Sequence, residues 1–121
     1  MYATLERIAL DEFNDLVESV QQIGRRANAP LKLRMGIRDS TFVDVWLSPD
    51  GARYAFHWEQ RARRGQIHRH DNAPDHPHIA THPKHFHNGS EENVEESYIP
   101  DDPQDAMRYF LTFVRHQFQP G

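Results

Sequence analysis

The sequence predicts an α+β fold in which a four-stranded antiparallel meander is flanked by an N-terminal and a C-terminal helix. Three observations predict this class. Apolar residues have helical spacing near the start of the chain, alternate with polar residues in four central segments, and return to helical spacing near the end. Short links between the central segments favour antiparallel neighbours. We expect residues 1–121 to form a single domain, with both helices on one face of the sheet.

The first helix is predicted over residues 4–26. Its apolar residues recur three or four positions apart, as on one face of an α-helix. Arg25 and Arg26 then suit the negative end of the helix dipole. The predicted apolar face consists of Leu5, Ile8, Ala9, Phe13, Leu16, Val17, Val20 and Ile23.

Four strands are predicted in the middle of the chain, because apolar and polar residues alternate there with a period of two. Turn residues such as Pro49 and Gly51 separate them. One face of the third strand, with Tyr54, Phe56 and Trp58, is predicted to lie in the core. The four segments are residues 31–38, 42–47, 54–59 and 66–71.

A long loop rich in histidine and proline is predicted after Asp71, since its prolines are incompatible with a long helix or a central strand. Residues 94–99 have the composition of a short edge strand. The last helix is predicted to begin with Asp102 as N-cap and Pro103 in its first turn. Its apolar stripe is Ala106, Phe110, Leu111, Val114 and Phe118.

Composition restricts the classes of function. The chain has no cysteine, which excludes disulfides and thiolate zinc sites. No apolar run approaches the roughly 20 residues of a membrane span, so we expect a cytoplasmic protein. The formal net charge of −4 disfavours a general nucleic-acid coat protein. A local basic site remains compatible with that charge, since four arginines precede or enter the histidine-rich segment: Arg61, Arg63, Arg64 and Arg69.

The segment from His68 to His87 holds seven of the nine histidines. Packing does not explain this concentration, because imidazole is neither a strong strand former nor a good core group. Imidazole does exchange protons near neutral pH, bind metals and donate hydrogen bonds as a cation. The segment is therefore predicted to carry a site, although its spacing does not by itself specify the reaction.

The preferred hypothesis is a metal-independent endoribonuclease that requires no cofactor. Either His76 and His78, or His85 and His87, would act as general base and acid, and Asp71 would orient one imidazole. Nearby polar residues would bind the substrate, with the cationic ones on its phosphate. The predicted substrate-binding residues are Arg64, Arg69, Lys84 and Asn72.

Two alternatives remain open. In the first, the chain is a metal-binding hydrolase or nuclease, and Asp71 is a ligand or a partner of a ligand. The divalent metal would then be held by His76, His78, His85 and His87. In the second, the chain is a non-enzymatic binding module whose histidines form a pH-sensitive interface.

The order of several short segments resembles the TumE family of toxins from prokaryotic toxin–antitoxin systems. The segments are Tyr54–Trp58, Arg69–Pro74, His76 and His78, Thr81 and Pro83, His85 and His87, and Ser90–Ser97. The resemblance extends from about Leu31 to the last helix. One departure is that Asp75 precedes His76 and Pro77 separates it from His78, whereas two histidines often follow the Asn-Ala-Pro step directly in the family.

The resemblance implies a cytoplasmic toxin that is silenced by a helix-turn-helix antitoxin and acts on RNA or translation. That implication agrees with the ribonuclease hypothesis, which itself rests on the histidines and the neighbouring arginines. We expect no membrane partner. Exposed edge strands would also allow a homodimer.

Overall fold

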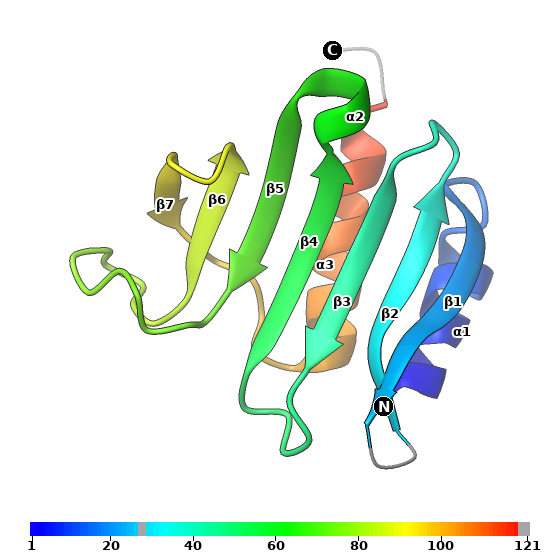
Figure 1. The fold of residues 1–121 in the computed structure, drawn as a ribbon, viewed down its shortest axis with the longest axis horizontal. Coiled ribbons are helices and arrows are strands. Elements are labelled where there is room, and N and C mark those ends of the chain that lie inside the picture. The colour runs from blue at the N-terminus through cyan, green and yellow to red at the C-terminus, as the bar shows by residue number, and fades with distance from the viewer. Residues whose placement is uncertain (27–28, 119–121) are drawn as a thin grey trace.

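The structure is a computed structural model that describes residues 1–26 and 29–118. Within these residues it has one sheet of seven antiparallel strands, whose order in space is their order in the chain (Figure 1). The strands are β1 (Val17–Arg26), β2 (Ala29–Ile37), β3 (Phe42–Leu47), β4 (Tyr54–Gln60), β5 (Gln66–Asp71), β6 (His85–Gly89) and β7 (Val94–Glu96). The helices are α1 (Tyr2–Glu12), α2 (Arg61–Arg64) and α3 (Pro103–His116).

The predicted four-stranded sheet is therefore wrong, although the overall class is still α+β. Strands β2 to β5 correspond to the four predicted strands, and β7 lies within the segment proposed as a short edge strand. Strands β1 and β6 extend the sheet on either side of the predicted four. The short link between β4 and β5 forms the helix α2, which ends at Gly65 with a φ of 69°.

The helix predicted over residues 4–26 ends at Glu12, and β1 follows it. A register irregularity between Val17 and Ser19 explains the misleading pattern. Val17 pairs with Ile37 and Val20 pairs with Met35, so the irregularity places two residues three positions apart on the core face. A bulged edge strand thus reproduces the apolar spacing of a helix.

Strand β6 was hidden in the predicted loop because Phe86 is the one apolar side chain among its five residues. His85 and His87 are buried on one face of β6, and Phe86 lies on the other. The alternation of a strand is present, but a search for apolar residues does not detect it. Pro83, just before the strand, further disfavoured a strand assignment.

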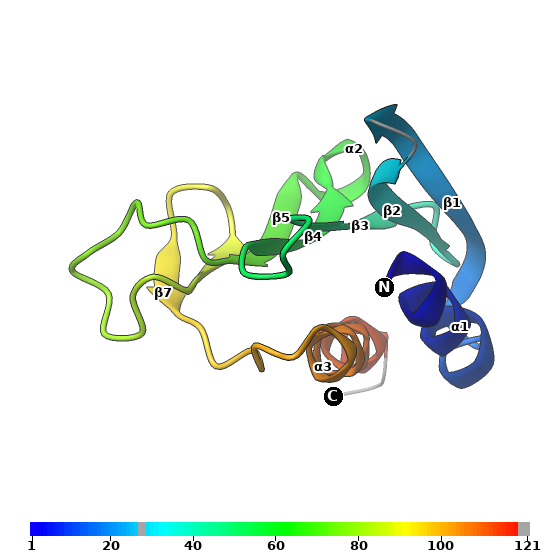
Figure 2. The same ribbon diagram turned by 90° about the horizontal axis from the view of Figure 1, so that it is seen from below.

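The core lies between the sheet and two helices, α1 and α3, which cover the same face (Figure 2). The predicted core triplet Tyr54, Phe56 and Trp58 is buried there, and Phe110 of α3 packs against Phe56 with ring centroids 6.1 Å apart. The predicted cap of α3 is also present, since the Asp102 side chain accepts a hydrogen bond from Asp105 N.

Neither α1 nor α3 covers the other face of the sheet (Figure 2), where several polar side chains lie. Because side chains alternate along a strand, residues next to the core triplet point to this open face. On this face Arg34 of β2 and Asp44 of β3 form an ion pair, in which Arg34 Nε donates to Asp44 Oδ1 at 2.8 Å. The open face also holds His57 and Arg69, which lie opposite each other on β4 and β5.

Two histidines of β5 point the other way, into the layer beneath α3. His70 is 4% exposed, its ring stacks on Phe86 at 4.1 Å, and its Nδ1 lies 2.7 Å from Ser97 Oγ. Burial lowers the pKa of His70 to about 3. His68 is buried nearby, and its pKa is also lowered by burial. Both imidazoles are therefore buried between the sheet and α3, where burial favours their uncharged form.

We predict that His70 makes the fold sensitive to acid. The unfolded chain binds a proton at His70 near pH 6.5, whereas the folded chain binds it only near pH 3. The contribution of uncharged His70 to the free energy of unfolding is complete above pH 6.5. It is lost as the pH falls toward 3, by roughly 1 kcal/mol per pH unit. Urea unfolding at several pH values should show a shallower loss for His70→Gln than for the wild type. Equal slopes would contradict this assignment.

Candidate functional site

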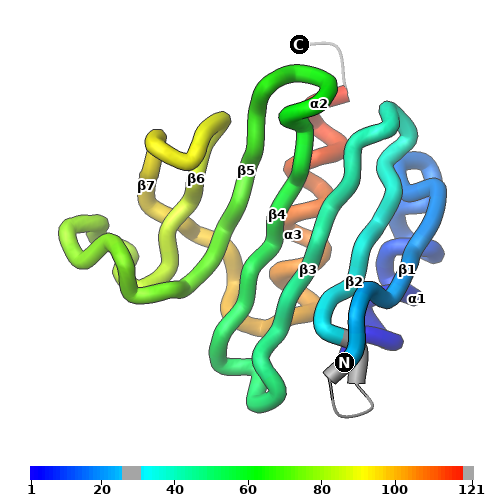
Figure 3. Tube along the Cα trace, viewed as in Figure 1, coloured from blue at the N-terminus to red at the C-terminus, as the bar shows by residue number. Residues whose placement is uncertain are grey.

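Three histidines meet where the long loop returns to the sheet. His85 and His87 lie on β6, and residues 72–84, which extend beyond β6 and β7 in the view of Figure 3, bring His76 to them. The ring centroids of His76 and His85 are 4.5 Å apart, and those of His85 and His87 are 4.9 Å apart. We call His76, His85 and His87 the histidine cluster. His85 and His87 are buried, whereas His76 is half-buried.

Asp71, at the end of β5, faces the cluster. Its Oδ1 lies 3.2 Å from His85 Nε2, and its Oδ2 lies 3.7 Å from His87 Nε2. The antiparallel register of β5 and β6 produces this arrangement, because Asp71 pairs with His85. Ala73 N donates to Oδ1 at 3.0 Å and Arg69 Nε donates to Oδ2 at 3.1 Å, so the carboxylate is held from two sides.

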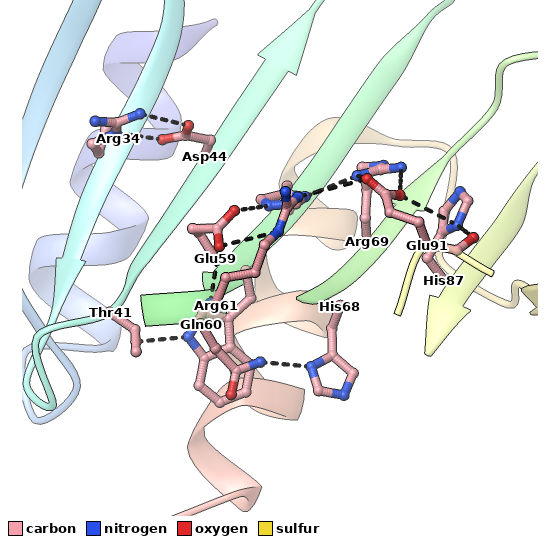
Figure 4. A network of polar contacts seen from close by, with 12 residues as sticks. Arg34, Thr41, Asp44, Glu59, Gln60, Arg61, His68, Arg69, His87 and Glu91 are labelled. Carbon is pink, nitrogen blue, oxygen red and sulfur yellow. Dashed lines mark hydrogen bonds and ion pairs between the residues drawn. The ribbon is translucent and has the colours of Figure 1, made fainter. Parts of the chain in front are cut away.

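Arg69, which binds Asp71, also belongs to a network of polar contacts with Glu91 on the open face of the sheet (Figure 4). Arg69 donates hydrogen bonds to Asp71, to Glu91 and to His57 Nδ1, the last at 3.1 Å. Burial of Arg69 opposes its charge, but the hydrogen bonds to Glu91 and Asp71 outweigh it and raise the pKa of Arg69. The hydrogen bond from Arg69 lowers the pKa of Glu91. Arg69 therefore binds both Asp71 and Glu91 and holds these carboxylates beside the cluster.

Two histidines beside this network have lowered pKa values. Burial is the main cause for His57, although the hydrogen bond from its Nε2 to Glu59 Oε1 at 3.1 Å opposes the effect. Burial is also the main cause for His87, against the hydrogen bond to the Glu91 carbonyl. His57 belongs to the supporting network, since it does not line the cleft at the cluster.

The cluster opens into a cleft of about 250 Å³. Asp71 and the three clustered histidines line it together with Trp46 and Arg53, two residues that were not predicted for the site. Trp46 is 39% exposed. Its signal was available in the sequence: Trp46 follows the inward-facing Val45 in an alternating strand, which places a large aromatic group on the polar face.

The remaining predicted site residues lie outside the cluster. His78 is exposed, with its ring centroid 6.0 Å from that of His76. Arg64 pairs with Asp39 and donates to Gln60 Oε1 at 2.9 Å. The other two contact backbone carbonyls: Lys84 Nζ donates to Ile99 O at 2.7 Å, and Asn72 Nδ2 donates to Ala52 O at 2.7 Å. Of the predicted residues, the structure thus brings together His76, His85, His87 and Asp71, with Arg69 behind Asp71.

The site combines imidazoles, a fixed carboxylate and an open cleft. Such groups can transfer protons, and they can also bind a cation. The ligand atoms of the three clustered histidines all lie within 4.8 Å of one another, a spacing compatible with a shared metal ion. The chain is therefore a small α+β protein with a histidine-lined cleft on the open face of its sheet.

Comparison with known protein families identifies the family to which the chain belongs. The family model described as Toxin TumE matches residues 5–118, so the chain belongs to the TumE toxin family. It is a toxin component of a toxin–antitoxin system, and membership implies an antitoxin partner. No curated protein and no solved structure matches the chain. Among the helices in the described parts of the chain, none has the length and apolar character needed to cross a membrane.

Proposed function

We propose that this toxin cleaves RNA and that the reaction takes place in the cleft at the histidine cluster. The observation that supports this proposal is that His76, His85 and His87 gather beside Asp71 and line an open cleft together with it. A toxin of this kind would act in the cytoplasm, where its substrate is found. The antitoxin that silences it would be a helix-turn-helix protein.

The chemistry of RNA cleavage matches the groups in the cleft. The 2′-hydroxyl oxygen attacks phosphorus, its proton passes to a base, and the bond from phosphorus to the 5′ oxygen breaks. The leaving oxygen then takes up a proton, and the negative charge on the phosphoryl oxygens must be stabilised throughout. Imidazoles or a metal ion held by them can meet these needs. Arg53, which lines the same cleft, is placed to pair with phosphate.

The wall of the cleft also suits a nucleotide. Trp46 is a partly exposed aromatic ring beside a cation, and bases stack on such rings in single-stranded nucleic-acid sites. This pairing supports single-stranded RNA as the substrate class, in spite of the acidic net charge of the chain. Arg69 is not needed for this contact, because its guanidinium already binds two carboxylates.

We predict that Trp46→Ala weakens binding of single-stranded RNA by about 5- to 150-fold, which corresponds to the 1–3 kcal/mol of one stacked base. Fluorescence anisotropy of a labelled oligonucleotide measures this change. Tyr98→Ala is the matched control, because Tyr98 is an aromatic side chain that is 71% exposed but does not line the cleft. Equal effects of the two substitutions would remove Trp46 from the binding site.

Incubation of the purified protein with a defined single-stranded RNA tests the proposed function. The wild type should yield fragments with 2′,3′-cyclic phosphate ends. His76→Ala and the double variant His76→Ala/His85→Ala should not. The control is His78→Ala/His82→Ala, which removes two exposed histidines of the same loop and leaves the cluster intact. Uncut RNA with wild-type protein, with or without added divalent metal, would refute the proposal.

A further inference from the structure

We infer that the histidine cluster is a binding site for a divalent transition-metal ion such as Zn²⁺, held by the Nε2 atoms of His85 and His87 together with His76. This inference concerns the same cleft as the proposed function and gives that reaction a cofactor. The metal site itself does not depend on RNA being the substrate.

The first argument is the tautomer of the two buried imidazoles. His85 Nδ1 lies 3.1 Å from Pro83 O, and His87 Nδ1 lies 2.9 Å from Glu91 O. A backbone carbonyl can only accept a hydrogen bond, so both Nδ1 atoms must carry the proton. When these rings are neutral, their Nε2 lone pairs point to the cluster. Metal-bound histidines are commonly fixed in this way, with one ring nitrogen on a carbonyl and the other on the metal.

The second argument is the charge around these lone pairs. His85 Nε2 faces Asp71 Oδ1 at 3.2 Å, and His87 Nε2 faces Asp71 Oδ2 at 3.7 Å. Lone pairs directed at a carboxylate repel it, and the side chain of His85 is only 1% exposed, so little water can relieve the repulsion. A cation among these atoms would convert the repulsion into attraction. Arg69 does not fill that place, because it contacts Asp71 through Nε on the side of Glu91.

The third argument is geometry. Two ligand atoms on one tetrahedral zinc ion are about 3.4 Å apart, given bonds of about 2.1 Å. The 3.2 Å between Asp71 Oδ1 and His85 Nε2 is close to this spacing, so the Asp71 carboxylate lies beside the proposed ion and compensates its charge. The three histidine atoms lie within 4.8 Å of one another, so closing the set to the tetrahedral spacing needs a shift of at most about 1.4 Å. His76 can make that shift because it is half-buried in a loop, whereas its partners are fixed on β6.

The nature of the ligands selects the metal. Imidazole nitrogen suits zinc and its neighbours in the first transition row, whereas Mg²⁺ and Ca²⁺ prefer oxygen ligands. Three protein nitrogens beside an open cleft also resemble a catalytic arrangement more than a closed structural one, since a catalytic zinc keeps a position free for water or substrate. His78 is not needed, because the group that meets the distance criterion consists of His76, His85 and His87.

The test is metal binding by the full chain, made without a histidine tag and stripped with a chelator. Titration with Zn²⁺ should show one ion per chain, and zinc should raise the thermal unfolding temperature. His76→Ala should weaken zinc binding by at least 10-fold, and His87→Ala should weaken it further. His78→Ala/His82→Ala should bind as the wild type does. Because His76 is half-buried in a loop, its variant is expected to fold, and circular dichroism of the apo proteins checks this point.

Absence of stoichiometric zinc binding, or equal affinity in the wild type and His76→Ala, would overturn the inference. Cleavage of RNA that persists after metal removal would refute the role of the ion as cofactor but not the ribonuclease. Tight zinc binding in a protein that leaves RNA uncut would have the opposite meaning: the metal site would stand and the proposed function would fall.

Discussion

Replacing Asp71 by alanine is expected to lower the rate of RNA cleavage by about 10- to 100-fold, the usual cost of removing a carboxylate that orients active imidazoles or binds with them. Asp71 lies within 3.7 Å of two Nε2 atoms of the cluster and is itself held by Arg69 and Ala73 N. Its loss leaves His85 and His87 without their acidic neighbour. Single-turnover cleavage of a labelled RNA measures the effect.

Asp75→Ala is the matched control for this experiment. Asp75 is an exposed carboxylate that lines the same cleft, so its removal changes the local charge by the same amount. We expect little change in rate. If both variants lose activity equally, the net charge of the cleft would explain the effect, and the specific position of Asp71 beside the cluster would not. Asp71→Asn, which keeps the shape of the side chain, should fall between wild type and Asp71→Ala.

The largest effect on stability is expected for Phe110→Ala. The Phe110 side chain is fully buried and contacts Phe56, His70 and Phe113, with ring centroids 5.8–6.1 Å away. Its truncation removes buried apolar surface and leaves a cavity, at a cost of about 3–5 kcal/mol. That is a large share of the 5–15 kcal/mol that typically stabilises a domain. Chemical denaturation followed by circular dichroism gives the change in the free energy of unfolding.

Tyr109→Ala provides the comparison, since Tyr109 is the neighbouring residue on α3 and is 41% exposed. Its loss should cost much less than that of Phe110. A similar loss in the free energy of unfolding for both variants would mean that α3 does not pack on the core through Phe110.

The parts of the fold that the sequence predicted correctly are those with unbroken periodicity. Strands β2 to β5 alternate cleanly, and α3 has both its cap at Asp102 and its apolar stripe. The errors have local physical causes. The irregularity after Val17 gives β1 the spacing of a helix, and β6 has a single apolar side chain, Phe86, between two buried histidines.

The residues of the candidate site were likewise predicted correctly only in part. His76, His85, His87 and Asp71 were predicted as site residues, and the structure brings them together. Arg64 and Lys84 were predicted because they are near the histidines in sequence, but their contacts are with Asp39 and with Ile99 O, which the sequence does not pair with them. Trp46 lies in β3 and Arg53 in the turn before β4, both far along the chain from the histidine-rich segment. Alternation places Trp46 on the open face, but only the sheet register brings the two residues to the histidine cluster.

Induced expression in growing cells tests the central claim, that toxicity depends on RNA cleavage at the histidine cluster. Three proteins are compared for growth and for the integrity of total RNA: the wild type, His76→Ala/His85→Ala and His78→Ala/His82→Ala. We predict growth arrest with fragmented RNA for the wild type and for the second variant, and normal growth with intact RNA for the cluster variant at equal protein levels. Arrest and RNA fragmentation by the cluster variant, or arrest by the wild type with intact RNA, would contradict the claim.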